Sequence, residues 1–128
     1  MQRRKTFRLI VATGAAVIMS LTASLATAQK ADVQAGKEKY LQFCASCHGA
    51  AGKGDGPAAA ALNPKPRDHS DAKYMATLKD EEVFNIIKQG GVPLGKSPLM
   101  PPWGQALSDQ DIRNVVGFIR TLAKPGAK

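Results

Sequence analysis

The only two cysteines of the chain stand in one short run, Cys44-Ala-Ser-Cys47, and His48 follows directly. Residues at positions i and i+3 share one face of a helical turn, so both thiols can reach the same group. Two cysteines at this spacing with a histidine next to the second are typical of c-type haem attachment. The thiols form thioethers with the haem vinyl groups, and the histidine reaches the iron. The motif therefore predicts a fold that encloses one covalent haem held by Cys44, Cys47 and His48.

Three other interpretations of the two cysteines compete with haem. Thioredoxin-like redox chemistry needs a βαβ context, which this sequence does not predict. A structural zinc site needs further ligands in a different layout. A disulfide between Cys44 and Cys47 stays open in an oxidising compartment. His48, together with the export signal described next, favours haem over the disulfide.

The N-terminus has the pattern of a secretory signal peptide. A basic head over residues 1–8 precedes a mostly apolar run over residues 9–25, and Ala26-Thr27-Ala28 ends it as a small-x-small cleavage site. The pattern predicts cleavage after residue 28 and export of residues 29–128 to the periplasm as one domain. An uncleaved membrane anchor is the alternative, and only in that case would the protein contact a membrane.

Charge and composition restrict the partners. The formal net charge is +8, and half of it comes from the four basic residues of the head. No basic stripe with interleaved aromatic residues appears, so nucleic acid is not an expected partner. The remaining lysines suit a patch that attracts an acidic protein partner. Aromatic residues make up only 5% of the chain. A small domain so poor in large side chains builds a modest core, and a large apolar cofactor would complete it.

Three helices are predicted, over residues 31–43, 80–89 and 109–122. Apolar residues recur in each at helical spacing, most clearly in the second and third. Gly90 is a C-terminal stop for the second helix, and Ser108 is the N-cap of the third. Proline- and glycine-rich loops connect the helices, and no β-rich stretch or internal repeat appears. The predicted fold class is all-α, with loops wrapped around the cofactor.

One motif points to a chemistry that the context excludes. Residues 90–97 match the phosphate-binding loop G-x-x-x-x-G-K-[ST] letter for letter. That loop needs a strand before it and a helix after it. Here a predicted helix precedes the motif, and Pro98, Pro101 and Pro102 follow it. We therefore expect no nucleotide site, and we interpret Gly90 and Gly91 as a helix stop and turn.

The chain resembles the class I c-type cytochromes, the bacterial mono-haem family, over nearly all of residues 29–128. The resemblance rests on the haem motif and on Gly36-x-x-x-Tyr40, which is similar to the first helix of that family. It implies a cytochrome c fold of three main helices around one haem. It also implies that Gly36 lets the C-terminal helix cross closely, with Phe118 as the aromatic partner near Tyr40.

The glycine-rich segment from Gly49 to Pro57 resembles the loop that many bacterial members place after the haem motif. The resemblance implies that the Pro57 carbonyl accepts the ring N–H of His48, a type of bond that fixes the tautomer of a ligating histidine. One departure is Lys79, where members often have a Ser or Thr helix cap. We expect Asp80 to take that role.

The sixth iron ligand must come from another segment. Met100 lies in the proline-rich run from Ser97 to Trp103, which resembles the Met-Pro ligand loop of the family. Met75 precedes a predicted helix and is expected to fill the core. His69 lies in a polar loop and is expected to be exposed. Met100 is therefore the predicted ligand, with Met75 and His69 as its rivals.

Two further donors lie near the predicted site. Arg67 and Trp103 can each donate to a haem propionate. For Trp103, packing against the haem is the favoured interpretation. For Arg67, a propionate contact and a solvated charge stay equally open.

An iron bound by both histidine and methionine has no open position, so the expected function is one-electron transfer by a carrier that is not itself an enzyme. A thioether ligand favours the reduced iron and raises the potential. One alternative is a fixed cytochrome subunit of a dehydrogenase or terminal oxidase. Another is a haem peroxidase or gas sensor with a displaceable methionine. Lys53 and Lys96 are expected to flank the haem edge and to meet an acidic partner.

Overall fold

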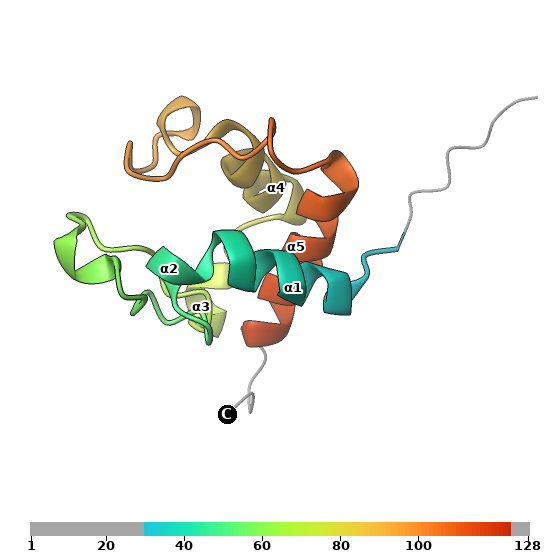
Figure 1. The fold of residues 1–128 in the computed structure, drawn as a ribbon, viewed down its shortest axis with the longest axis horizontal. Coiled ribbons are helices and arrows are strands. Elements are labelled where there is room, and N and C mark those ends of the chain that lie inside the picture. The colour runs from blue at the N-terminus through green and yellow to red at the C-terminus, as the bar shows by residue number, and fades with distance from the viewer. Residues whose placement is uncertain (1–29, 124–128) are drawn as a thin grey trace, which may run out of the picture.

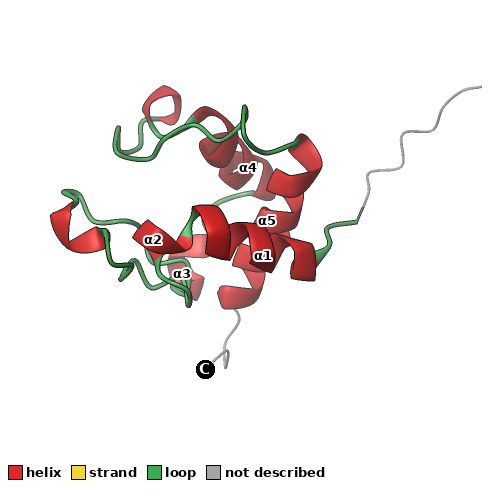
Figure 2. Ribbon diagram, in the orientation of Figure 1, coloured by secondary structure: helices red, strands yellow, loops and turns green. Residues whose placement is uncertain are grey.

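The computed structural model describes residues 30–123, and within that range it consists of helices and loops without strands (Figures 1 and 2). In chain order, the elements are α1 (Val33–Phe43), α2 (Ala45–His48), the 3-10 turn η1 (Ala59–Ala61), α3 (Ala72–Met75), α4 (Asp80–Gln89), the 3-10 turn η2 (Val92–Leu94) and α5 (Asp109–Leu122). The all-α prediction is confirmed. The predicted signal segment, residues 1–28, lies outside the described residues.

No helix among residues 30–123 is both long enough and apolar enough to cross a membrane.

The ends of the main helices follow from their caps. The Asp32 carboxylate accepts hydrogen bonds from the backbone N–H groups of Gln34 and Ala35, at 3.0 Å each. This capping starts α1 at residue 33, two residues later than predicted. The Ser108 hydroxyl accepts from the backbone N–H of Asp111 at 3.1 Å, which confirms Ser108 as the N-cap of α5.

The cap of α4 differs from the prediction. The Glu82 carboxylate accepts the backbone N–H of Lys79 at 2.8 Å. Asp80 instead pairs with Arg120 of α5, with 2.7 Å between Oδ1 and Nε. The prediction for Asp80 was wrong because the third helical residue is the one whose side chain reaches back to the N-cap backbone.

The end of α4 is as predicted. Gly90 stops the helix with a φ of 79°. The segment that matches the phosphate-binding loop follows α4 and contains η2, so it has no strand before it.

Helix α1 crosses α5 closely at Gly36 (Figure 1). A Cβ atom built on Gly36 would lie only 1.9 Å from the backbone carbonyl oxygen of Asn114. One turn along α1, the Tyr40 ring packs edge-on against Phe118, with ring centroids 5.2 Å apart. Both expectations for this crossing are confirmed.

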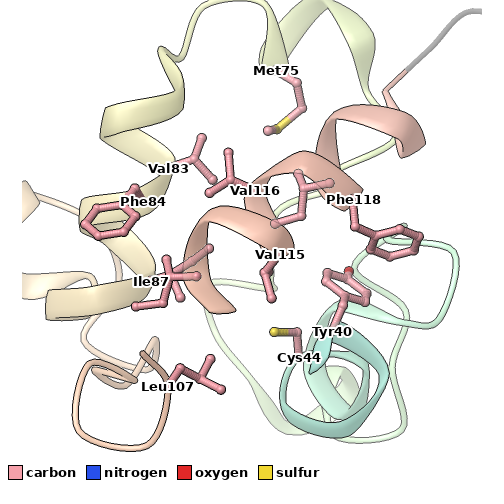
Figure 3. Close-up of a cluster of buried hydrophobic side chains, with 12 residues drawn as sticks. Tyr40, Cys44, Met75, Val83, Phe84, Ile87, Leu107, Val115, Val116 and Phe118 are labelled. Carbon is pink, nitrogen blue, oxygen red and sulfur yellow. The ribbon is translucent and has the colours of Figure 1, made fainter. Parts of the chain in front are cut away.

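The core is a single small cluster of buried side chains, mainly from α1, α4 and α5 (Figure 3). Its members are Tyr40, Cys44, Met75, Val83, Phe84, Ile87, Leu107, Ile112, Val115, Val116, Phe118 and Ile119. Cys44 belongs to the cluster and lies beside Tyr40 in Figure 3, whereas Cys47 and His48 are only partly buried. Within the described chain, the haem motif therefore lies at the edge of the core.

Candidate haem site

The haem motif lies where α1 passes into α2. The backbone N–H of Cys44 donates to the Tyr40 carbonyl at 2.8 Å, and the backbone N–H of His48 donates to the Cys44 carbonyl at 2.9 Å. Helical hydrogen bonding thus runs through the motif and keeps its three functional residues on adjacent turns. Both cysteines are free thiols, so the disulfide interpretation does not describe this structure. Burial, followed by the neighbouring Cys47, raises the pKa of the Cys44 thiol to about 12.

The His48 ring has a defined tautomer. Its Nδ1 lies 3.0 Å from the backbone carbonyl oxygen of Arg67. A carbonyl oxygen can only accept, so Nδ1 carries the proton and Nε2 keeps a free lone pair. Burial lowers the pKa of His48, although its hydrogen bond to Arg67 opposes that shift. A neutral imidazole with a free Nε2 is the form that binds a metal.

The acceptor of the His48 N–H was predicted wrongly as Pro57. The loop after the motif folds back along α2 instead. The backbone N–H of Gly56 donates to the Cys47 carbonyl at 3.2 Å, and the backbone N–H of Ala58 donates to the Ser46 carbonyl at 2.9 Å. These bonds satisfy carbonyls that α2 leaves open. The His48 ring donates instead to the carbonyl of Arg67, which lies farther along the chain.

His69 is partly buried, which corrects the expectation of an exposed histidine. Its ring stacks on the His48 ring, with centroids 4.2 Å apart and planes inclined by 16°. Its Nδ1 lies 3.2 Å from the Tyr40 hydroxyl oxygen. Burial lowers the pKa of His69 to about 3, and His48 acts in the same direction, while Asp68 opposes it. The His69 ring is therefore neutral at ordinary pH.

The two methionines differ sharply in their surroundings. Met100 is partly buried against the core cluster. Its backbone N–H donates to the Ser97 carbonyl at 3.2 Å, and its carbonyl accepts from Gly91 at 3.0 Å. These bonds connect residues within the loop between α4 and α5. Figure 1 shows this orange loop on the side of α4, away from α2. Met75 is only 2% exposed within the core cluster, as predicted for a core residue.

The two candidate donors have separate roles. The Trp103 ring packs on Phe43, with centroids 5.4 Å apart, and its packing against the haem stays a prediction. The Arg67 guanidinium lies 4.8 Å from the centroid of the Tyr74 ring. Arg67 also contributes its backbone carbonyl to the site, which was not expected from the sequence, and a propionate contact of its guanidinium stays a prediction. Pro64 and Pro66 gave a weak signal, because prolines keep a segment out of helix and leave its carbonyls available.

These residues fit haem c. Two free thiols stand three residues apart in helical backbone, and the following imidazole has a free Nε2. Phe43, Met100 and Trp103 are only partly buried against the core, so they still present apolar surface. Thiols, imidazole and thioether are the donor groups through which c-type haem is held. The fold and the site together define a cytochrome c.

The chain belongs to the cytochrome c family. The family model described as cytochrome c oxidase, cbb3-type, subunit III, matches residues 31–119. This membership implies haem c as the cofactor and electron transport as the general role of the domain.

Relatives of this chain include separate cytochromes and subunits of larger complexes. The chain is 35% identical to cytochrome c-554(547) of Halothiobacillus neapolitanus over 95 residues, which cover 71% of this chain and 97% of that protein. It is 34% identical over 108 residues to the cbb3-type cytochrome c oxidase subunit FixP of Rhizobium meliloti, covering 84% of this chain but only 33% of FixP.

A solved structure has the same fold. The KustC0563 c-type cytochrome superposes with a TM-score of 0.55 at 28% identity, covering 70% of this chain and 98% of that one.

Proposed function

We propose that this protein is an exported, mono-haem, class I cytochrome that carries one electron at a haem attached through Cys44 and Cys47. His48 and Met100 would be the two protein ligands of its iron. The observation that carries the proposal is the hydrogen bond from His48 Nδ1 to the Arg67 carbonyl, because it leaves Nε2 free to bind iron. Haem c, when bound, supplies an iron that alternates between the ferrous and ferric states.

Each residue of the site has a distinct role. Cys44 and Cys47 anchor the haem through thioethers, so it cannot dissociate during turnover. The Arg67 carbonyl holds the imidazole of His48 in the ligating tautomer. A thioether from Met100 favours the ferrous state and raises the potential. If both side chains bound the iron, no position would remain for a substrate, which suits a carrier rather than an enzyme.

The surroundings of the rivals support Met100 as the sixth ligand. Two imidazoles on opposite faces of one haem point their nitrogens at each other across the iron, whereas the His69 ring lies face to face with His48. Met75 would have to leave the core, where its side chain is 2% exposed. The backbone of that segment is also tied to α5, since Arg120 donates to the Met75 carbonyl at 2.6 Å.

Intact-mass spectrometry of protein purified from an expressing host with a haem-attachment system tests the proposal. The expected mass is that of residues 29–128 plus one haem, which survives denaturation. A haem-free mass after denaturation would refute covalent attachment. A mass that includes residues 1–28 would refute cleavage and leave the haem assignment intact.

A fixed subunit of a larger complex is the second candidate function. It is favoured by the similarity to FixP and by 33% identity to the cytochrome c subunit of a quinone alcohol dehydrogenase of Gluconacetobacter polyoxogenes, of which this chain spans only 18%. Size-exclusion chromatography of extracts from the native organism distinguishes the two. A free carrier elutes at the size of one small domain, and a subunit co-elutes with an oxidase or dehydrogenase activity.

A peroxidase or gas sensor is the remaining alternative, and it requires Met100 to leave the iron. Tight carbon monoxide binding to the reduced wild-type protein would support it. A closed carrier does not bind carbon monoxide at the same concentrations.

The proposed partner is an acidic redox protein. The sequence has no acidic residue between Glu82 and Asp109. Lys96 lies in this stretch and is exposed. Val92, Leu94 and Leu99 are also exposed there. Figure 1 shows the loop between α4 and α5, which contains Lys96, at the same end of the molecule as the loop that carries η1. Lys53, which precedes η1 in the chain, is exposed as well. Apolar side chains near lysines suit a transient docking surface for an acidic partner.

A further inference from the structure

We infer that His69 is a positioning residue for the proposed iron ligand, because its ring fixes the orientation of the His48 imidazole plane. The inference rests on the proposed function, in which His48 binds the haem iron. The two rings lie nearly parallel, with centroids 4.2 Å apart and an angle of 16° between their planes. A flat group in contact with one face of an imidazole blocks its rotation about the Cβ–Cγ bond, since rotation would drive ring atoms into the neighbour.

His69 can act in this way because it is itself held in place. The Tyr40 hydroxyl lies 3.2 Å from Nδ1 of His69. The backbone N–H of His69 donates to the Gly52 carbonyl at 2.6 Å. Tyr40 is fully buried on α1, and its ring packs against Phe118 of α5. The orientation of His48 is thereby tied to the crossing of the two longest helices of the described chain.

The glycine loop closes around this pair of side chains. A Cβ atom at Gly52 would lie 3.1 Å from Cβ of His69 and 3.5 Å from the Tyr40 hydroxyl oxygen. Gly52 also has a φ of +75°, which side-chain-bearing residues rarely adopt. The loop backbone therefore lies directly against the Tyr40–His69 pair.

The hydrogen bond to Arg67 and the stack on His69 restrain different motions. The bond from Nδ1 to the Arg67 carbonyl, 3.0 Å long, fixes where that edge of the ring points. This hydrogen bond alone would still allow the His48 ring to rotate about the N–H···O axis. Contact with the face of the His69 ring prevents that rotation. Groups beyond the ligand that orient it also tune the metal. In a low-spin ferric haem, the axial imidazole plane sets how the unpaired electron is distributed over the macrocycle.

The haem-methyl proton shifts of the ferric protein report that distribution, so they test the inference. His69→Leu removes the flat face at similar size, while His69→Phe keeps a flat face and removes the bond to Tyr40. We expect the leucine variant to shift the haem-methyl pattern and the phenylalanine variant to restore most of it. Haem content and the near-infrared sulfur-to-iron band stay at wild-type values in both. These readouts separate ligand orientation from a general loss of structure.

An unchanged haem-methyl pattern in His69→Leu overturns the inference and leaves the proposed function standing. Wild-type protein without a low-spin ferric haem overturns the proposed function and the inference with it. If His69→Leu does not accumulate as folded protein, the smaller variant His69→Ala decides, since it also removes the flat face beside His48. A shifted pattern in that variant supports the inference, and an unchanged one contradicts it.

Discussion

At the scale of single residues, a main-chain carbonyl decides which nitrogen of His48 can bind a metal. The Arg67 carbonyl accepts a hydrogen bond from the Nδ1–H group and leaves Nε2 free. Cys44 and Cys47 lie in the same helical stretch, one buried and one partly exposed. The site therefore depends on three side chains with roles that do not overlap, and each can be removed separately.

Removing either thiol should sharply reduce mature holoprotein, because a single thioether leaves the haem attached at one vinyl group only. We expect this result for Cys44→Ala and for Cys47→Ala, measured as haem stain per unit of protein on a denaturing gel. His48→Ala should reduce holoprotein as well, or leave a high-spin product. Ser46→Ala is the matched control inside the motif, and it should stain as wild type. Full staining of either cysteine variant would contradict the attachment claim.

At the scale of elements, the main helices and, through the family resemblance, the crossing of α1 and α5 were predictable, whereas the loop contacts around His48 were not. Ser108 and Gly90 mark helix ends through local chemistry, so the sequence was sufficient to place them. The contact between His69 and Tyr40 joins residues 29 positions apart. No local pattern encodes such a pair, since it depends on how the loops return to α1. The same reason explains why Arg67, and not Pro57, meets His48.

The crossing of α1 and α5 should not tolerate a side chain at residue 36. In an isolated helix, Gly36→Ala would be favourable by about 1 kcal/mol. Here the added Cβ meets the Asn114 carbonyl oxygen at 1.9 Å, so the helices must separate. Overpacking of this kind costs about 1–3 kcal/mol, so we expect a net loss of about 1 kcal/mol, and at most about 2 kcal/mol, in thermal unfolding of the holoprotein.

Gly117→Ala is the control for that crossing. Its added Cβ would meet side-chain carbons of Ala31 and Val33, at 2.8 Å and 3.8 Å, near the beginning of α1. Those atoms are side-chain carbons and can shift more easily than the backbone of α5. The loss should therefore be smaller than for Gly36→Ala. Equal stability of Gly36→Ala and wild type would contradict the close crossing.

At the scale of the whole molecule, we expect the core that residues 30–123 form to be too small to hold a stable domain without a cofactor. Twelve buried residues form the cluster, and Phe43, Met100 and Trp103 stay partly exposed around it. A domain of this size buries a limited share of its surface, so a large apolar cofactor adds much of what is missing. Folding and haem attachment should therefore be linked.

The haem-free chain should be largely unfolded for this reason. Far-UV circular dichroism of the Cys44→Ala, Cys47→Ala double variant measures it directly. We expect low helicity and no sharp thermal transition, against a cooperative transition in the holoprotein. Native-like helicity with a sharp transition would show that the protein's own side chains can stabilise the fold without haem.

Docking of the whole molecule should depend moderately on salt. The described surface carries exposed lysines at positions 53 and 96, but half of the formal charge of +8 lies in the predicted signal segment. The association rate with an acidic redox partner should fall as salt rises, because added ions screen the attraction. Stopped-flow measurements over a salt series test this. A rate independent of salt would point to docking through apolar contacts such as Leu99.

The near-infrared absorption of the ferric protein tests the central claim most directly, because the sulfur-to-iron band requires both a haem and a methionine ligand. We predict that wild-type protein shows this band and that Met100→Ala abolishes it, opens the iron to carbon monoxide and lowers the potential, while the haem stays attached. Met75→Leu and His69→Gln should keep the band. A Met100→Ala protein that retains the band and the wild-type low-spin spectrum would contradict the account.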